Sequence, residues 1–517
     1  MAEPAISKKV KDGPLIVGAG PTGLALAHRL VRHGVPFRII DRSPGPGTTS
    51  RAMVVQARSL ELYRQIGLAD EMVALGIRLE GAHLRSKRGE ITRVAFGEMG
   101  AGLSPYPFVL SLAQDEHERF LVDRLAEQGV AVEWETALVS FSDADDGVLA
   151  VLDRRGVREE ARFDYLCGCD GAHSAVRQQL GLDFPGGTYD ELFYVADVKT
   201  DRPVGDWFVG TFGNRTIGLV FPVRRTDMQR MIGIVPPELR DRADLRFSDV
   251  QPYAEALLHL HVLDVNWFSS YRVHHRVAAH FRSGRVFIAG DAGHIHSPAG
   301  GQGMNTGIGD AVNLSWKLAQ VLQGRIDPAV LDTYETERIA FARVLVESTD
   351  RAFRLFVGRG PAARFFRTIL VPKILPFLAG FERMRRAAFN LVSQIRINYH
   401  DSAVSGGKAG TVRGGDRLPW VPMRESDNFA PLRSIDWQVH VYGTVDAALR
   451  TMAIRTGMPV HGFEWSAAAE KAGLQRDAFY LVRPDGYVAL AAEDQDPARL
   501  AGYIRRWQLR PGRETTF

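Results

Sequence analysis

Residues 284–318 read GRVFIAGDAGHIHSPAGGQGMNTGIGDAVNLSWKL, which predicts a buried strand, a glycine-rich loop and a helix in succession. The strand is predicted over residues 286–289 and is followed by Gly290 and Asp291. Glycines let the backbone of a loop approach a flat or charged ligand, because they have no side chain. The helix would then offer unpaired N–H groups and the positive end of its dipole. Alone, this stretch only hints at a nucleotide site.

A second glycine motif lies near the start of the chain, at Gly18, Gly20 and Gly23. It follows the apolar residues 15–17 and opens a predicted helix, which is the G-x-G-x-x-G pattern of a dinucleotide-binding unit. The next predicted strand ends at Asp41, where a carboxylate would accept hydrogen bonds from a ribose hydroxyl. A tight turn without a ligand could use the same glycines. The strand, the helix and the terminal acid together favour a nucleotide site.

The composition is that of an ordinary globular protein. The 517 residues are 45% hydrophobic and 24% charged, which predicts roughly two to four domains. A net charge of +4 without long runs of like charge argues against nucleic acid as a partner. The two cysteines, Cys167 and Cys169, are expected to be buried strand thiols, and so few cysteines fit a reducing, cytoplasmic location. Neither a signal peptide nor a transmembrane segment is expected from the apolar pattern.

The texture of the sequence changes along the chain and predicts five segments. The first and third would form one discontinuous α/β nucleotide-binding domain, and the third ends in a helical region rich in arginine and phenylalanine. The second has short apolar strands between turn residues, which predicts an inserted, mainly antiparallel sheet. The fourth is a glycine-rich linker and the fifth a further unit. The segments are residues 14–185, 186–275, 276–401, 402–415 and 416–517.

The helical region allows two interpretations. A basic amphipathic helix can lie on a lipid surface. Packing against the main body or against a second subunit is the favoured interpretation, so a homodimer stays open.

Three widely separated motifs resemble those of the group A flavoprotein aromatic hydroxylases, the para-hydroxybenzoate hydroxylase family. The first is the glycine motif at 18–23, and the second is CDGAHSAVR at 169–177. The third is Gly290-Asp291 with Pro298 and with GQGMN at 301–305. The resemblance covers about residues 14–400. Residues 405–517 look like the thioredoxin-like C-terminal domain of the phenol hydroxylase branch, without a cysteine for dithiol chemistry.

The resemblance implies an α/β fold with a discontinuous Rossmann-like FAD domain, an inserted β-sheet substrate domain and a thioredoxin-like C-terminal domain. It also implies bound FAD, with the pyrophosphate at the first glycine motif and Asp41 at the adenosine ribose. The N–H groups at residues 303–305 would face the pyrimidine edge of the flavin, which is negative when reduced. The residues implied to bind FAD are Gly18, Gly20, Gly23, Asp41, Arg42, Arg51, Gln114, Asp170, Asp291, Gly301, Gly303, Met304 and Asn305.

Two residues near these have a second interpretation. Asp170 and Arg177 would serve both FAD and the nicotinamide cofactor, but Arg177 could equally close its turn with a salt bridge. Arg42 could indicate recognition of a 2′-phosphate, but we assign its pocket to FAD.

The implied reaction is hydroxylation of a phenol or another electron-rich ring through a flavin C4a-hydroperoxide formed with O₂. NAD(P)H would bind transiently, since there is no second G-x-G-x-x-G motif. The catalytic candidates are Arg51 beside the flavin, Pro298 at its reactive face and His296 as a proton acceptor. A plain hydrogen-bonded loop histidine is the favoured interpretation of His296. No metal is expected, although His294 and His296 look like a pair of ligands at first sight.

The inserted sheet would cover the small aromatic substrate. Only some strand residues would face inward, because side chains alternate between the two faces. Each candidate is individually more often core than ligand-binding. The candidates are Phe208, Phe212, Leu219, Phe221, Met231 and Tyr271.

Other functions stay open. A related flavoenzyme could perform epoxidation or Baeyer–Villiger-type oxygen insertion, for example on a polyketide. A flavin-dependent dehydrogenase that uses no oxygen and a non-catalytic FAD-binding protein are further alternatives. A halogenase is disfavoured because the chain has no W-x-W-x-I-P motif.

Overall fold

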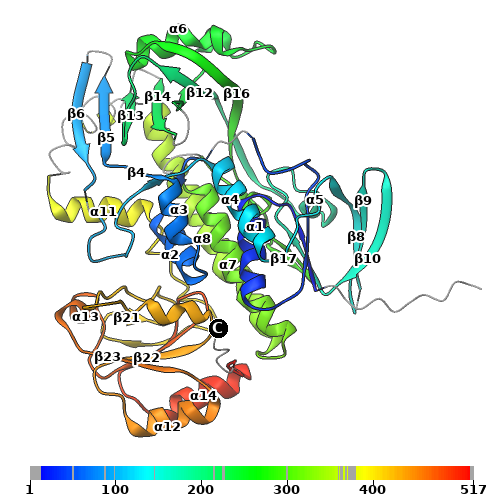
Figure 1. Cartoon of the computed structure of the whole chain (residues 1–517), viewed down its shortest axis with the longest axis vertical. Helices are drawn as coiled ribbons and strands as arrows, with labels where there is room; N and C mark the ends of the chain where they lie inside the picture. Colours follow the sequence, from blue (N-terminus) through cyan, green and yellow to red (C-terminus); the bar gives the residue numbers. More distant parts are fainter. Residues whose placement is uncertain are drawn as a thin grey trace, which may run out of the picture.

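The computed structural model describes residues 13–48, 52–86, 89–97, 99–144, 146–212, 216–223, 227–297, 301–358 and 380–512, together with 360, 362, 365, 366 and 370. These residues form a mixed α/β protein (Figure 1). Helices α7 and α8 run through the middle of the view, the largest sheet lies above them and the C-terminal sheet lies below. In the described part of the chain, no helix has the length and apolar character needed to cross a bilayer.

The five-stranded sheet joins segments that are far apart in the sequence. Its order is β17-β18-β11-β1-β2, and all neighbours are parallel except β17 at the edge. Every residue of β1, β11 and β18 is buried, as expected for parallel strands covered on both faces. The strands are β1 (Pro14–Val17), β2 (Arg38–Ile40), β11 (Tyr165–Gly168), β17 (Arg282–Ser283) and β18 (Val286–Ile288).

The cysteine prediction is confirmed. Cys167 lies within β11 and Cys169 directly after it, and both are buried free thiols. Burial raises the pKa of the Cys167 thiol, which keeps it protonated and unreactive at neutral pH.

The helices cover the sheets and connect their strands. Helix α1 has Pro21 at its first position, where the missing N–H breaks no helical hydrogen bond. Helix α7 follows the loop at 301–302, and the predicted helical region contains α8 and α11. The helices before the C-terminal unit are α1 (Pro21–Arg32), α2 (Ala57–Gln65), α3 (Ala69–Leu75), α4 (Gln114–Glu127), α5 (Ala175–Gln179), α6 (Phe247–Leu258), α7 (Gly303–Leu322), α8 (Asp332–Val357) and α11 (Glu382–Val392).

The eight-stranded sheet has the order β19-β16-β12-β15-β14-β13-β5-β6, and only β13 and β5 pair in parallel. Residues 186–275 supply its centre, but β5, β6 and β19 come from outside the predicted segment. The pairing of β5 with β13 requires glycine at position 81. A Cβ there would lie only 2.4 Å from the ring of Trp207. The strands are β5 (Gly81–Ser86), β6 (Gly89–Ala95), β12 (Gly186–Thr200), β13 (Trp207–Phe212), β14 (Ile217–Pro222), β15 (Gln229–Ile234), β16 (Val262–Val277) and β19 (His294–Ile295).

Two three-stranded sheets complete the first part of the chain. One has the order β3-β7-β4 and the other β10-β9-β8. Their strands are β3 (Val54–Val55), β4 (Ile77–Arg78), β7 (Leu110–Ser111), β8 (Thr136–Ala144), β9 (Gly147–Arg154) and β10 (Val157–Phe163).

The C-terminal unit is a six-stranded mixed sheet with the order β21-β20-β25-β24-β22-β23. Helices α12, α13 and α14 accompany it. A tight turn with Gly486 at φ +77° joins β24 and β25 into an antiparallel hairpin. Its elements are β20 (Gly406–Ala409), β21 (Val412–Arg413), β22 (Gln438–Tyr442), α12 (Ala447–Thr456), β23 (Val460–Phe463), α13 (Ala467–Lys471), β24 (Phe479–Val482), β25 (Val488–Ala492) and α14 (Pro497–Trp507).

The prediction of a linker at 402–415 is wrong, because β20 and β21 lie within it. Its glycines allow close backbone packing. A Cβ on Gly407 would lie 2.0 Å from the Ala491 carbonyl oxygen, and one on Gly414 would lie 2.2 Å from the Gly406 nitrogen. The same glycines that indicate flexibility in a sequence therefore fit this segment tightly onto the C-terminal sheet.

Two buried histidines make the stability of the protein dependent on pH. His28 on α1 donates from Nε2 to the Leu121 carbonyl on α4, and burial lowers its pKa to about 4 despite that bond. His117 hydrogen-bonds to the Tyr63 hydroxyl, and burial lowers its pKa to about 3. The unfolded chain therefore binds protons below about pH 6.5 that the folded chain excludes. This stabilisation is complete above about pH 6.5 and is lost as the pH falls toward 4.

We expect His28 to contribute about 2 kcal/mol of stability at pH 7.5 that is absent at pH 5. Urea denaturation at the two pH values measures the difference. In His28→Gln the difference should shrink by that amount. An unchanged difference in this variant would contradict the assignment.

Candidate functional site

Three parallel strands end at the same edge of the five-stranded sheet, and each leads into one of the motifs. Gly18 follows β1, Asp170 follows β11, and Gly290 follows β18. In open α/β sheets, ligands bind outside the carboxyl ends of the strands. The structure therefore brings the three motifs together at one place.

The first glycine motif is packed against the second motif. Gly18 has φ +106°, and a Cβ there would lie 2.4 Å from the Cys169 carbonyl oxygen. A Cβ on Gly23 would lie 1.9 Å from the Gly18 carbonyl oxygen. Gly20 differs, because no heavy atom lies within 4 Å of the position of its Cβ. Gly18 and Gly23 thus shape the turn, while Gly20 borders open space at the start of α1.

Thr22 joins the first motif to the third. A Cβ on Gly290 would lie 2.4 Å from Thr22 Oγ1, and one on Gly307 of α7 would lie 2.2 Å from the same atom. The starts of α1 and α7 therefore converge on the turn at Gly290. Two helix N-termini with their positive dipole ends serve one site.

Asp41 holds the first glycine loop in place. Its Oδ2 accepts from the Ala19 N–H and its Oδ1 from the Ser43 N–H, both at 2.8 Å. Each carboxylate oxygen can accept a second hydrogen bond, so a ribose hydroxyl can still bind there. Arg42 is exposed beside it.

The second motif has an unsatisfied acceptor. Asp170 Oδ2 accepts from the Val176 N–H at 3.2 Å, while Oδ1 is buried and has no partner among the described residues. Arg177 donates to the carbonyls of Ala292 and Ala172, each at 2.9 Å. The alternative of a salt bridge for Arg177 is wrong within the described part of the chain, since its partners are carbonyls. It ties the second motif to the turn after β18.

The start of α7 offers N–H groups, as predicted. Its first helical hydrogen bond runs from the Thr306 N–H to the Gln302 carbonyl, so the N–H groups of residues 303–305 have no helical acceptor. The Asn305 side chain is used internally. It accepts from the Gln56 N–H and the Ser59 hydroxyl, and it donates to the Val54 and Gly301 carbonyls.

The other predicted cofactor residues lie in different surroundings. Gln114 begins α4 and donates its side-chain amide to Glu118 at 2.8 Å. Asp291 is exposed in the turn after β18. Gly301 has φ +62° directly before α7. Arg51 and Pro298 lie outside the described residues.

His296 has a neutral ring with one nitrogen that can accept a hydrogen bond. Its Nδ1 lies 2.9 Å from the Ser297 carbonyl, which places the ring proton on Nδ1 and leaves Nε2 as an acceptor. Nε2 is buried without a partner among the described residues and lies 3.6 Å from the position of a Cβ on Gly303. Burial lowers the pKa of His296 to about 4, so the ring is neutral at pH 7. The interpretation favoured from the sequence was a plain hydrogen-bonded loop histidine. The Nδ1 bond agrees with it, but Nε2 has no hydrogen-bond partner among the described residues.

His294 is held in place by a buried carboxylate. Its Nε2 is bonded to the Asp310 carboxylate at 2.7 Å. Among the residues that the structure describes, no cluster of His, Cys, Asp and Glu could hold a metal ion.

Four of the substrate candidates share one face of the eight-stranded sheet, which we call the lower face. The rings of Phe208 and Phe221 stack with centroids 5.3 Å apart. Leu219 is two residues from Phe221 on β14 and therefore points to the same side. Tyr271 and Ile217 of that strand both pack against a buried cluster that includes Phe353 of α8. The lower face therefore looks toward α8.

Met231 lies on the opposite face. It pairs with Val220, which alternates with Leu219 and Phe221, and it is fully buried in a cluster with residues of α6. Figure 1 shows α6 on the side of the sheet away from α7. The structure thus makes Met231 a core residue rather than a substrate contact. Phe212 ends β13 opposite Ile217, and its side chain lies outside what the structure describes.

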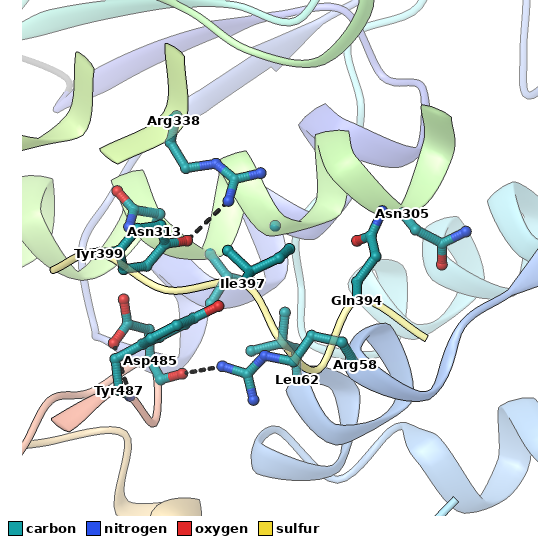
Figure 2. A pocket seen from close by; sticks show the side chains of 12 residues that line it. Arg58, Leu62, Asn305, Asn313, Arg338, Gln394, Ile397, Tyr399, Asp485 and Tyr487 are labelled. Carbon is teal, nitrogen blue, oxygen red and sulfur yellow. Dashed lines mark hydrogen bonds between the residues drawn. The ribbon is translucent and has the colours of Figure 1, made fainter. Parts of the chain in front are cut away.

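Two cavities lie elsewhere. The one in Figure 2 is small, about 10 Å³, and lies between α2, α7, α8 and the turn after β24; it is lined by Asn305 but by none of the first two motifs. A wider depression of about 1,090 Å³ lies near Tyr106, Trp207 and Ser426 and contains none of the predicted FAD residues. The three motifs at the carboxyl ends of β1, β11 and β18 form the candidate cofactor cleft.

The residues at the sheet edge fit FAD. Gly20 and Gly171 border open space, which a phosphate-bearing chain can fill. The unpaired Asp170 Oδ1 and the N–H groups at the start of α7 give acceptors and donors at separate ends of the cleft. An extended dinucleotide needs such separate polar contacts.

Comparison with known proteins agrees with this geometry. A family model described as an FAD binding domain matches residues 14–349. The 6-methylpretetramide 4-monooxygenase of Streptomyces rimosus is 34% identical, over 97% of this chain and 94% of that protein. Pentachlorophenol 4-monooxygenase of Sphingobium chlorophenolicum is 33% identical, over 78% of this chain and 75% of that protein.

Solved structures agree as well. The anhydrotetracycline hydroxylase of Streptomyces rimosus has a TM-score of 0.77 and 28% identity, covering 96% of this chain and 99% of that chain. A complex of aklavinone-11 hydroxylase with FAD and aklavinone has a TM-score of 0.79 and 26% identity, covering 97% and 99%.

The chain is thus a flavoprotein of the monooxygenase class. It belongs to the group A FAD-dependent aromatic hydroxylases, as the three motifs predicted. It is an FAD-dependent aromatic monooxygenase that uses NAD(P)H and O₂. Bound FAD supplies the redox chemistry, and the protein supplies binding, orientation and proton transfer.

Proposed function

We propose that the substrate is a fused-ring phenolic compound of the aromatic polyketide type. The single observation that carries this is the stacked pair Phe208–Phe221, which lies on the same face of the sheet as Leu219 and Tyr271. Relatives named for 6-methylpretetramide and anhydrotetracycline support a substrate of this size. Aromatic rings prefer offset stacking on such surfaces.

A substrate panel tests the proposal. Simple phenols and fused-ring phenols would be compared by the rate of NAD(P)H oxidation that they stimulate, with products identified by mass spectrometry under ¹⁸O₂. We expect only fused-ring phenols to give a hydroxylated product that carries one ¹⁸O atom. Hydroxylation confined to single-ring phenols would contradict the proposal. An epoxide or a ring-expanded product would support the alternative of epoxidation or Baeyer–Villiger-type insertion.

Phe221→Leu is expected to weaken substrate binding, because it removes one ring of the stacked pair. The loss should be about 1 kcal/mol, or roughly a fivefold rise in KM. Met231→Leu is the matched control, because it makes the same kind of change on the opposite face. Steady-state kinetics should show a KM within about twofold of the parent for this control. If the two variants raise KM equally, the lower face is not part of the substrate site.

The FAD contacts follow from the geometry of the cleft. We assign the pyrophosphate to the loop at Gly18, Gly20 and Gly23, the ribose to Asp41, and the flavin to the N–H groups of residues 303–305. The polar groups around Asp170 serve the middle of the cofactor. Arg51 and Pro298 stay predictions for the flavin face.

His296 would take the proton of the substrate hydroxyl. Its neutral ring and its unpaired Nε2, close to the start of α7, support this role. A phenol that loses its proton becomes more electron-rich and reacts more readily with an electrophilic oxygen. The protein would thus hold the ring, exclude water and remove one proton.

The domain assignment is part of the proposal. The eight-stranded sheet would act as the inserted substrate domain of the discontinuous Rossmann-like FAD domain. The C-terminal unit would be thioredoxin-like, which its parallel β22–α12–β23 unit and antiparallel β24–β25 pair support. A cytoplasmic location and a homodimer stay predictions.

A further inference from the structure

Asp310 on α7 has a carboxylate that is completely buried and makes three hydrogen bonds to different parts of the chain. Oδ2 accepts from the Gly290 N–H at 2.9 Å and from His294 Nε2 at 2.7 Å. Oδ1 accepts from Arg338 Nε at 2.6 Å. One side chain thus connects the turn after β18, strand β19 and helix α8.

The charge of Asp310 is secured by these partners. Burial alone would raise the pKa of the carboxyl, but Arg338 and His294 hold it below its ordinary value. A buried carboxylate that stays ionised needs such compensation. The group is therefore an anion at any pH at which the protein works.

The segment that Asp310 holds lies at the flavin end of the site. Gly290 and His294 lie on either side of Asp291, one of the residues implied to bind FAD, and His296 lies two residues after His294. Gly307 lies on the same face of α7 as Asp310, and its Cβ position is 3.2 Å from the Gly290 Cα. Asp310 therefore holds both ends of the loop after β18 against the N-terminal half of α7.

Arg338 extends the connection to the C-terminal part of the chain. Its Nη1 donates to the Tyr399 hydroxyl at 2.8 Å (Figure 2), and its Nη2 donates to the Thr306 carbonyl at 3.1 Å. Tyr399 in turn packs against Tyr487 with ring centroids 4.4 Å apart. The geometry of the flavin end is thus linked to the C-terminal unit.

We propose that Asp310 is a positioning residue for the flavin. It fixes the segment from Gly290 to His294 against the start of α7, and Arg338 and Tyr399 hold its carboxylate in place from the other side. The proposal rests on the assignment of FAD to this cleft. It adds that the alignment of the flavin with the N–H groups of α7 depends on a buried charge that does not touch the cofactor.

Asp310→Asn tests the proposal, because it keeps the shape of the side chain and removes the charge. We expect the Kd for FAD to rise about tenfold to a hundredfold, since hydrogen bonds to a charged group are lost. The reduction potential of bound flavin and its visible spectrum should also shift, and more of the NAD(P)H oxidised should yield hydrogen peroxide. Fluorescence titration, redox titration and product analysis measure these effects.

Glu61→Gln is the matched control. Glu61 is as deeply buried, pairs with Arg58 and Arg417, and makes no contact with the turn at Gly290. This variant should lose stability but keep its Kd for FAD within about twofold and its flavin spectrum unchanged. If Asp310→Asn folds and also keeps its Kd, spectrum and potential, the proposal is wrong.

Tyr399→Phe decides the matter if Asp310→Asn does not fold. It removes only the hydroxyl that accepts from Arg338, and we expect a smaller rise in the Kd for FAD together with a shifted spectrum. No change in either would overturn the proposal. A parent protein that binds no FAD would instead refute the cofactor assignment itself, so the two failures are distinguishable.

Discussion

Gly20→Ala is expected to abolish tight binding of FAD while leaving the fold intact. Gly20 has φ −76° and ψ −176°, which alanine adopts freely, and no heavy atom lies within 4 Å of the added Cβ. The methyl group would occupy the space that the pyrophosphate needs next to the first N–H groups of α1. Steric overlap and a lost charge-assisted hydrogen bond together cost about 4 kcal/mol, roughly a thousandfold in Kd.

Fluorescence titration of FAD and thermal denaturation of the protein without cofactor measure the two parts of this prediction. Gly502→Ala is the control, because Gly502 on α14 also has no heavy atom near its Cβ position. Gly20→Ala should melt at the temperature of the cofactor-free parent and fail to bind FAD. Gly502→Ala should bind FAD as the parent does and melt at the same or a slightly higher temperature, because alanine favours a helix interior. If Gly20→Ala still binds FAD tightly, the assignment of the pyrophosphate to this loop is wrong.

Glu337→Gln is expected to destabilise the protein by about 3–5 kcal/mol. Glu337 on α8 is completely buried and accepts from Lys317 at 2.9 Å and from Arg483 at 2.8 and 3.0 Å. Burial would raise the pKa of Glu337, but Arg483 and Lys317 hold it well below its usual value. Burial lowers the pKa of Lys317 to about 8 even with Glu337 present. The neutral amide would leave two buried cations without their shared anion.

Urea denaturation at pH 7 measures this loss. Glu347→Gln is the control on the same helix, because Glu347 is exposed and its pair with Arg351 is 3.4 Å long. Exposed pairs contribute little, so no measurable change is expected. A loss below about 1 kcal/mol in Glu337→Gln would mean that solvent or relaxation replaces the carboxylate at little cost. Since Arg483 lies in the turn between β24 and β25, the C-terminal unit should loosen first.

The local patterns of the sequence predicted the strand, turn and helix around Gly18 correctly. A strand before Gly18, a helix after it and an acid at Asp41 are short-range features, so periodicity and turn chemistry were enough. The buried cysteines followed from the apolar run around them. The pairing of β1, β11 and β18 could be expected only through the resemblance, because strand order is not written in any single segment.

Predictions failed where contacts between distant segments decide the structure. The glycines at 407 and 414 were interpreted as flexible, but neighbouring strands crowd them. The place of Met231 depends on which face of the sheet α6 covers. Strands β5 and β6 join a sheet whose centre lies more than a hundred residues away. The Asp310–Arg338–Tyr399 connection was missed because these residues lie on two helices and a loop. No periodic pattern in the sequence relates them.

Strands β11 and β18 are neighbours in the five-stranded sheet. The chain between them can therefore change without a change in the glycine loops. Leu166 pairs with Val286 and Gly168 with Ile288, so the long stretch between them leaves the central sheet and returns to it at adjacent points. Strands within that stretch can change in length or in the side chains on their faces without altering the spacing of the glycine loops. Under the proposed function, substitutions on the lower face would change the substrate while the glycine loops keep their arrangement.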